Sequence, residues 1–271
     1  MKNRAFLKWA GGKYRLAPEI NKHLPQGACL VEPFVGAGSV FLNTNFERYL
    51  LADINPDLIN LFNTVKTQLE PFLFASREIF HHPQANTADF YYVTRAEFNA
   101  ESDIFRRSVL FLYLNRFGFN GLCRYNQKHQ FNVPFGRYKK PYFPEAEIRF
   151  FAQKAERATF VCMDFVALFD WLVDNLDDYV VYCDPPYAPL DQASNFTQYA
   201  SHHFGLLQQQ TLAEQARRLQ AENIPVVISN HDTAFTREIY QGAQIHSLPV
   251  QRFIGQKPSS RVKVMELVAV F

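Results

Sequence analysis

Five apolar residues, Tyr179-Val180-Val181-Tyr182-Cys183, run directly into the turn Asp184-Pro185-Pro186-Tyr187. A short apolar run that ends in a turn predicts a strand buried on both faces, as in parallel sheets. The two prolines end this strand and stiffen the turn, because proline restricts both its own backbone and that of the residue before it. Asp184 and the Pro185 carbonyl are therefore expected at the carboxyl edge of a sheet, where open α/β folds bind ligands. A rigid turn with a helix-capping Asp184 is the alternative.

Similar apolar runs predict further strands elsewhere in the chain. They lie at Cys29 to Val31, Tyr49 to Ala52, Thr159 to Cys162, Pro225 to Ser229, Ile245 to Val250 and Val264 to Phe271. Helical patterns are found at Ser39 to Phe46, Pro56 to Leu69, Phe165 to Asn175, Leu206 to Glu222 and Thr233 to Gln241. This alternation predicts a doubly wound α/β sheet. The last two strands have no helix between them, so an antiparallel pair is expected.

The alternation stops after Asp57 and resumes near Thr159, which predicts an inserted, mainly helical domain. Within it, residues 104–144 contain eight Lys or Arg and no Asp or Glu, whereas the net charge of the whole chain is only +2. One basic block in a nearly neutral chain suits a polyanion such as a nucleic acid. A basic surface that faces acidic residues of the same fold is the alternative.

The cysteines indicate a reducing compartment. Four of them are far apart in sequence and form no C-x-x-C pair, which predicts reduced thiols and no zinc site. No apolar segment is long enough for a secretion signal or a membrane span, so we expect a cytoplasmic protein. Nothing in the sequence is typical of a coiled coil, and a monomer is expected.

A glycine-containing turn follows the first strand in the sequence LVEPFVGAGSV, residues 30–40. Gly36 and Gly38 let the backbone approach a ligand closely, but Phe41 replaces the third glycine of a dinucleotide motif, which argues against NAD or FAD. Asp53 ends the next strand, where an acidic residue accepts hydrogen bonds from ribose hydroxyls. A turn or helix cap before Pro56 is the alternative for Asp53.

The acceptors of the Asp184 turn suit the amino group of adenine, whose lone pair is delocalised into the ring. Two acceptors on its hydrogens favour the tetrahedral geometry that frees the lone pair, and they stabilise the positive charge that develops during attack. Tyr187 offers a flat face on which an extruded base can stack.

Three motifs carry a family resemblance: Asp184-Pro185-Pro186-Tyr187, Phe34-Val35-Gly36-Ala37-Gly38 and Lys8-Trp9-Ala10-Gly11-Gly12-Lys13. Residues 114–116, 120–126 and 132–140 extend the resemblance along essentially the whole chain. The sequence resembles the amino-methyltransferases, specifically the Dam-type DNA adenine methyltransferases. This implies a Rossmann-like, doubly wound α/β domain at residues 1–56 and 145–271 that binds S-adenosylmethionine, with a helical DNA-recognition domain inserted at 57–144.

The resemblance also implies the site residues, with S-adenosylmethionine as cofactor, no metal, and double-stranded GATC as substrate. The cofactor contacts are Trp9, Lys13, Phe34, Gly36, Gly38, Asp53, Asp164, Phe165 and Asp184, and the catalytic residues are Asp184, Pro185 and Tyr187. Taken alone, the Lys8 to Lys13 segment is a basic loop, Phe34 a core residue, and Asp164 the cap of a helix that begins at Phe165.

The inserted domain is expected to read the DNA. Arg124 is expected to bond O6 and N7 of guanine in the major groove, and Phe119 to act as an apolar wedge where the family commonly has a tyrosine. Phosphate contacts are expected from Arg116, Arg137, Lys139 and Lys140. The other DNA-proximal positions are Lys8, Asn120, Leu122, Pro134 and Tyr138. The helical spacing of Phe111, Tyr113 and Leu114 indicates core residues instead.

Two further segments are open to interpretation. Ser229-Asn230-His231-Asp232 is similar to part of a hydrolytic triad but lacks a nucleophile elbow, so we expect a loop near the target pocket in which Asp232 caps a helix. Residues 251–263 form a basic stretch whose sequence differs from the one expected of the family, and no DNA contact is assigned to it.

The alternative functions are methylation of RNA or of a protein glutamine, and DNA binding without catalysis. Asp rather than Asn at position 184 and the DNA-type insert argue against the first. The intact motifs argue against the second. A zinc deaminase is excluded, because H-x-E and P-C-x-x-C are both missing.

Overall fold

The computed structural model describes residues 2–189, 204–253 and 261–271. The chain forms two compact units of mixed α/β structure. The first comprises Met1–Pro18, Val35–Asn45 and Asp53–Cys162, and the second Glu19–Phe34, Phe46–Ala52 and Met163–Phe271. Residues 254–260 of the basic stretch near the C-terminus lie outside the described residues.

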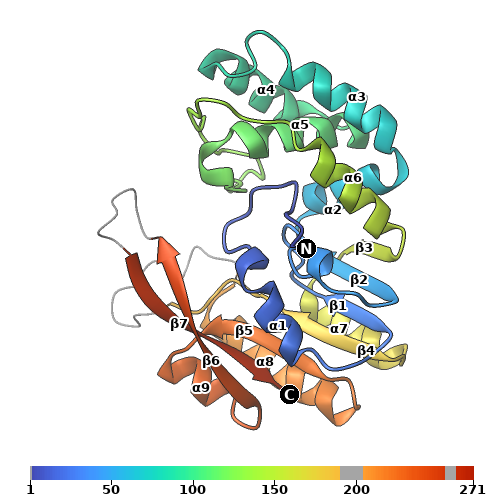
Figure 1. Cartoon of the computed structure of the whole chain (residues 1–271), viewed down its shortest axis with the longest axis vertical. Helices are drawn as coiled ribbons and strands as arrows, with labels where there is room; N and C mark the ends of the chain where they lie inside the picture. Colours follow the sequence, from blue (N-terminus) through green and yellow to red (C-terminus); the bar gives the residue numbers. More distant parts are fainter. Residues whose placement is uncertain (1, 190–203, 254–260) are drawn as a thin grey trace. The chain divides into compact units, whose positions relative to one another are not determined.

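The second unit is built on an open, mostly parallel sheet (Figure 1). Its strands, in spatial order, are β2 (Arg48–Asp53), β1 (Cys29–Glu32), β4 (Tyr179–Cys183), β5 (Val226–His231), β7 (Arg261–Val270) and β6 (Gln244–Phe253). The first four are parallel to one another, whereas β7 pairs antiparallel with both β5 and β6. Every residue of β1, β4 and β5 is buried, which explains their continuous apolar sequences. The antiparallel terminal pair is confirmed.

Helices cover both faces of this sheet. Figure 1 draws α1 (Ala17–His23) in front of the strands, and α7 (Phe165–Asp174) and α8 (Leu206–Ala221) behind them. The short helix α9 (Ala234–Ile239) follows β5. The sequence prediction of a doubly wound α/β sheet is confirmed.

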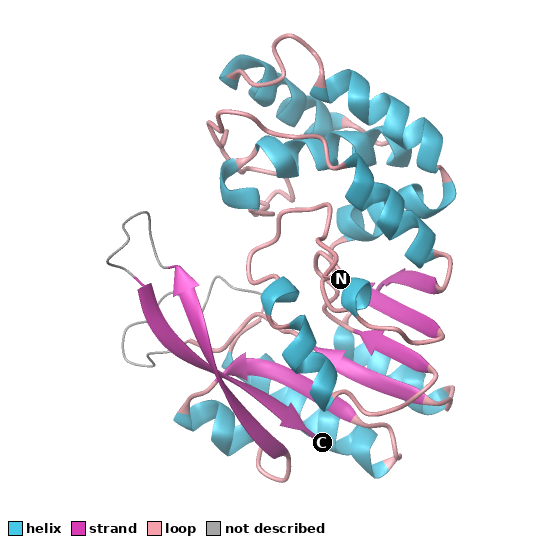
Figure 2. Ribbon diagram, viewed as in Figure 1, coloured by secondary structure: helices cyan, strands magenta, loops and turns pink. Residues whose placement is uncertain are grey.

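The first unit is mainly helical (Figure 2). Its elements are α2 (Pro56–Thr67), α3 (Leu69–Phe80), α4 (Ala88–Ala100), α5 (Ile104–Phe117), α6 (Glu145–Ala155) and β3 (Ala158–Cys162), with short 3-10 turns at Lys13–Arg15, Phe41–Asn43 and Phe119–Gly121. The central helix is α5, which contacts α2, α3 and α4. Phe111, Tyr113 and Leu114 have no exposed surface, so the prediction that they are core residues is confirmed.

Two of the predicted helices differ from the structure. The helix expected at Ser39 to Phe46 is only the 3-10 turn Phe41–Asn43. The Asn43 amide donates to the Ser39 carbonyl and the Thr44 hydroxyl to the Val40 carbonyl, so side chains take up the acceptors of a continuing helix. The helix expected from Pro56 ends at Thr67, because Gln68 leaves the helical conformation before α3 begins.

Candidate active site

The turn after β4 lies where the strand order of the second unit changes direction. β1 has β2 on one side and β4 on the other, and all three strands are parallel. Asp184 directly follows β4, and Phe34 lies two residues after β1. Both residues therefore come at the carboxyl ends of adjacent strands, the position at which open α/β sheets bind ligands.

Buried amide side chains hold this turn. Gln209 of α8 donates from Nε2 to the Pro186 carbonyl at 2.7 Å, and the Ala188 amide donates to Oδ1 of Asn230 at 3.0 Å. Asn230 in turn donates from Nδ2 to Oε1 of Gln209 and to the Tyr240 hydroxyl, each at 2.9 Å. Because Asn230 and Gln209 are at most 1% exposed, these bonds fix the backbone beside Asp184 in a water-excluded setting.

Tyr187 is held at its hydroxyl and along its ring. The hydroxyl donates to Glu266 Oε2 of β7 at 2.9 Å, and the ring meets the His231 ring edge to face at 4.9 Å. Burial, together with the nearby negative charge of Asp184, raises the pKa of Tyr187 well above its usual value. Tyr187 is therefore a neutral aromatic residue with a fixed orientation.

The interpretation of residues 229–232 as a loop was wrong. Ser229, Asn230 and His231 are the last residues of β5 and are buried, because β5 pairs with β7 in register His231 to Glu266. Asp232 does not cap the following helix: the Thr233 hydroxyl accepts from the Thr236 amide, and Asp232 is paired with Arg237. The structural role of this segment is to support the Asp184 turn.

An aromatic cluster stands at the end of β1 in the second unit. The Phe34 ring lies 5.5 Å from Phe165 and 5.4 Å from Phe204. Asp164 caps α7 by accepting from the Val166 amide at 2.8 Å, which confirms the capping alternative for this residue. Phe34 is partly exposed, whereas Phe165 is only 4% exposed and packs on Phe34, Phe169 and Phe204.

The glycine turn of the first unit is bonded to Asp53. Gly36 and Gly38 have φ angles of +47° and +70°, which favour glycine. Asp53 accepts from the Gly36 amide at 3.2 Å and from the Asn55 amide at 2.9 Å, and burial raises its pKa despite these bonds. Asn55, not Asp53, caps α2. Asp53 is thus a buried acceptor beside a glycine turn.

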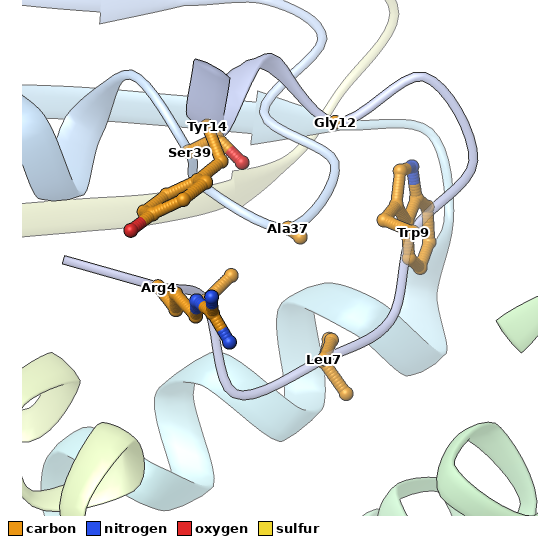
Figure 3. A pocket seen from close by; sticks show the side chains of 8 residues that line it. Arg4, Leu7, Trp9, Gly12, Tyr14, Ala37 and Ser39 are labelled. Carbon is orange, nitrogen blue, oxygen red and sulfur yellow. The ribbon is translucent and has the colours of Figure 1, made fainter. Parts of the chain in front are cut away.

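The N-terminal segment, residues 4–14, packs against the glycine turn at Gly36 and Gly38. A Cβ atom on Gly36 would lie only 2.8 Å from Trp9 Nε1, so the indole packs directly on the glycine. Lys13 is 5% exposed and donates from Nζ to the Gly11 carbonyl at 3.0 Å. A cavity of about 220 Å³ lies between this segment and the glycine turn, and Figure 3 shows Arg4, Leu7, Trp9, Gly12, Tyr14, Ala37 and Ser39 around it. The segment therefore forms a wall against the glycine turn.

Lys8 is fixed against residues 115–138 of the same unit. Its backbone exchanges two hydrogen bonds with the buried Asn115 side chain, at 2.9 and 2.8 Å. Its ammonium group donates to the Arg116 carbonyl and lies 3.5 Å from the centre of the Tyr138 ring. Burial, with the positive charge of Arg116 beside it, lowers the pKa of Lys8 to about 8.

The basic residues of 104–144 divide into two groups. Three are used within the fold: Arg106 pairs with Glu97, Arg107 with Asp57, and Arg116 donates to the carbonyls of Phe6 and Tyr142. Arg116 is only 7% exposed, so the structure does not present it for a phosphate contact. The exposed cations are Arg124, Lys128, Arg137, Lys139 and Lys140.

The remaining predicted DNA-proximal residues lie in the same segment. Phe119, Asn120 and Pro134 are exposed, and Leu122 is half-buried. Phe119 is 42% exposed, an unusual position for a large aromatic side chain. Asn120 has a φ of +53° and donates its amide to the Tyr138 hydroxyl at 2.8 Å, which fixes the backbone next to Phe119.

Sequence reasoning missed the residues that position the site, namely Asn55, Asn115, Gln209, Tyr240 and Glu266. Their signal was a polar side chain inside an apolar segment, such as Asn115 in FLYLNRF (residues 111–117) or Glu266 in VMELVAV (residues 264–270). Buried polar groups of this kind need partners, and the partners here are distant in sequence.

The described residues contain no group of three or more His, Cys, Asp or Glu that would hold a metal ion. The cysteines are free thiols, with Cys29 and Cys183 buried and Cys162 exposed. No helix within residues 2–189, 204–253 and 261–271 is long and apolar enough to cross a membrane.

Comparison with known proteins identifies the family. Residues 9–254 match the family described as D12 class N6 adenine-specific DNA methyltransferase. The chain is 60% identical to a DNA adenine methylase of Haemophilus influenzae and 58% identical to one of Escherichia coli K12, and it aligns over its whole length with 94% and 96% of those proteins. A DNA adenine methylase of Vibrio cholerae is 55% identical, over the whole chain and 96% of the relative. The chain belongs to the D12 class of N6 adenine-specific DNA methyltransferases.

Proposed function

We propose that this enzyme transfers the methyl group of S-adenosylmethionine to N6 of an adenine that is flipped out of double-stranded GATC. The observation that carries the proposal is the Asp184–Tyr187 turn, which is fixed by buried hydrogen bonds at the point where the strand order changes direction. The family resemblance implies GATC as the target site. The exposed Arg124, which can bond a guanine edge, supports this target.

The residues present fit an adenosyl cofactor. Gly36, on which a Cβ atom would lie 2.8 Å from Trp9, stands beside the buried acceptor Asp53. The apolar rings of Phe34 and Phe165 contact each other at 5.5 Å. We assign Trp9, Lys13, Gly36, Gly38, Asp164 and Asp184 to the same ligand. When bound, S-adenosylmethionine supplies a methyl group on a positively charged sulfur.

Asp184 and the Pro185 carbonyl accept the two hydrogens of the adenine amino group in the proposed reaction. These acceptors favour tetrahedral nitrogen, orient its lone pair toward the methyl group, and stabilise the positive charge that develops on N6. The hydrogen bonds from Gln209 and to Asn230 hold the turn in place before the reaction. The acceptors therefore need no rearrangement when the methyl group is transferred. Tyr187 stacks on the flipped base and keeps water from it.

DNA is assigned to the inserted domain, residues 57–144, and the catalytic domain to residues 1–56 and 145–271. Phe119 is the apolar wedge that holds the base stack open, and its exposure supports this role. Arg137, Lys139 and Lys140 bind phosphates, while Lys8, Asn120, Leu122, Pro134 and Tyr138 line the DNA. The enzyme is expected to act as a monomer on the DNA of the cytoplasm, in association with the nucleoid.

The test uses labelled S-adenosylmethionine with three duplexes, which contain GATC, a scrambled site, or GATC already methylated at adenine. We expect label only in the unmethylated GATC duplex. Equal labelling of the scrambled duplex would refute the site, and no labelling of any of the three duplexes would refute DNA as the substrate.

A further inference from the structure

The two neighbours of Arg124 point into the protein. Residues 123–125 are extended, with Tyr125 bridged antiparallel to Phe131 and the Asn132 amide donating to the Arg124 carbonyl at 3.0 Å. Successive side chains of an extended chain face opposite sides. Arg124 is exposed, whereas Cys123 and Tyr125 are partly buried. Whatever holds these two side chains therefore sets where the Arg124 backbone lies, while Asn132 accepts from Arg124 Nε at 2.7 Å and from Nη2 at 3.3 Å and so orients the guanidinium on that backbone.

The Tyr125 hydroxyl is bound to a buried ion pair. It donates to Asp57 Oδ2 at 2.6 Å, and Arg107 donates to the same carboxylate from Nε at 2.5 Å and from Nη2 at 3.1 Å. Asp57 lies in the first turn of α2 and is 6% exposed. Arg107 is held in its turn by the carbonyls of Phe98 and Glu101. Charge-assisted bonds at a partly buried carboxylate give a strong and directional anchor for Tyr125.

Cys123 connects through hydrogen bonds to the glycine turn of the same unit. Its sulfur accepts from the Asn55 amide nitrogen Nδ2 at 3.2 Å. The Asn55 backbone amide donates to Asp53 Oδ1, and Asp53 Oδ2 accepts from Gly36. One series of hydrogen bonds thus leads from the glycine turn through the cap of α2 to the residue that precedes Arg124.

Both anchoring groups keep their protons. Burial raises the pKa of the Cys123 thiol to about 12, and burial with the nearby charge of Asp57 raises the pKa of Tyr125. The Tyr125 hydroxyl therefore remains a hydrogen-bond donor at neutral and moderately alkaline pH.

We propose that Tyr125 is a positioning residue for sequence recognition, which holds Arg124 in its base-reading orientation through the Asp57–Arg107 ion pair. The inference rests on the proposed function, because it assumes that Arg124 reads guanine. Tyr125 itself touches no base. Its hydroxyl aligns the extended segment, and the arginine side chain on the opposite face is aligned with it.

The test is Tyr125→Phe, which removes the hydroxyl and leaves the Asp57–Arg107 pair in place. The ratio of kcat/KM on a GATC duplex to that on an AATT duplex, in which both guanines are replaced, measures discrimination. We expect Tyr125→Phe to lower this ratio about tenfold, because the free energy that a hydrogen bond to a charged group contributes corresponds to about a tenfold change. The loss should fall on kcat/KM for GATC, with turnover on AATT changed less than twofold.

Tyr113→Phe is the matched control. Tyr113 is equally an inward-facing tyrosine of the first unit, and its hydroxyl donates to the Ala85 carbonyl at 2.7 Å. Tyr113→Phe should lower the free energy of unfolding about as much as Tyr125→Phe does, and it should leave the discrimination ratio unchanged. If both variants lose discrimination alike, the effect is general loosening and the proposal is overturned.

A double-mutant cycle shows whether Tyr125 acts through Arg124. In an Arg124→Ala background, Tyr125→Phe should cause no further loss of discrimination. An independent, additive loss would overturn the proposal, as would an unchanged ratio in Tyr125→Phe alone. Failure of the proposed function is distinguishable, because wild-type enzyme would then already show no preference for GATC over AATT.

Discussion

The Asp184–Tyr187 turn is held by buried amides and carboxylates, whereas residues 104–144 present cations at an exposed surface. Asn230, Gln209 and Glu266, which support the turn, are between 0 and 4% exposed. Lys139 and Lys140 of the basic segment are exposed. The difference suits the proposed tasks: a reacting nitrogen requires acceptors at fixed positions, while phosphate contacts depend mainly on charge and tolerate varied side-chain geometry.

The basic segment also shows that a charge count overstates a binding surface. Arg107 and Arg116 contribute to the positive block in sequence, yet both bind partners inside the first unit. Only the exposed cations are available to DNA. The two regions are therefore best separated by substitutions that affect chemistry, stability and salt-dependent binding differently.

Asp184→Ala should have the largest effect. Loss of the acceptor is expected to lower kcat by about a thousandfold. The affinity for a GATC duplex should change less than about twofold, because the phosphate and groove contacts are proposed for other residues. Single-turnover methylation and fluorescence anisotropy measure the two quantities. Asp170→Ala, which removes an exposed partner of Arg218 in the same unit, is the control and should change neither. Turnover retained within tenfold would remove Asp184 from the chemistry.

Asn230→Ala should connect stability with catalysis. It leaves the Ala188 amide and Gln209 without their buried partner, which is expected to cost about 3 kcal/mol in the free energy of unfolding, and to lower kcat about tenfold through the displaced turn. Urea denaturation and steady-state kinetics measure both. The exposed Asn175→Ala should cost less than about 1 kcal/mol. A destabilised Asn230→Ala enzyme with unchanged kcat would show that the support does not position the chemistry.

Arg116→Ala and Lys139→Ala should separate buried from exposed cations of the same segment. The first is expected to lower the free energy of unfolding by about 2 kcal/mol, because Arg116 bonds two carbonyls in the interior. The second should leave stability unchanged and reduce the slope of log affinity against log salt by about one. The opposite pattern, with stability lost only in Lys139→Ala, would reverse the assignment.

Lys8 should give the smallest effect, seen in its pH dependence. Its pKa of about 8 lies below the usual value, so its positive charge is present below this pH and lost above it. Folding stability from this group rises as pH increases from about 8 to the unfolded value, since the unfolded chain then binds more protons. DNA affinity should fall about threefold between about pH 7 and about pH 9, and the fall should be absent in Lys8→Arg. Equal pH profiles for both proteins would remove Lys8 as the cause.

The sequence predicted those parts of the fold that depend on local pattern. β4 has the predicted bounds, because a strand buried on both faces reads as an uninterrupted apolar run. The Asp164 cap was likewise visible from the chain order. The helix after Ser39 was wrong, because contacts such as that of Asn43 with Asn3, forty residues earlier, decide the conformation there.

The support of the site was not predictable in the same way. Glu266 meets Tyr187, and Asn230 meets Ala188, only because β5, β7 and the β4 turn are adjacent in the folded sheet. The burial of Arg116 also depends on the N-terminal segment, more than a hundred residues away. Sequence pattern indicates that a polar residue inside an apolar run is exceptional, but its partner is set by topology.

The most direct test of the central claim is to identify the methylated nucleoside. A GATC duplex methylated to completion with labelled S-adenosylmethionine is digested to nucleosides and separated by chromatography with mass detection. We predict that all label is in N6-methyl-2′-deoxyadenosine, with one methyl group per strand of each site. Label in a methylated deoxycytidine, or more than one methyl group per strand of each site, would contradict the account.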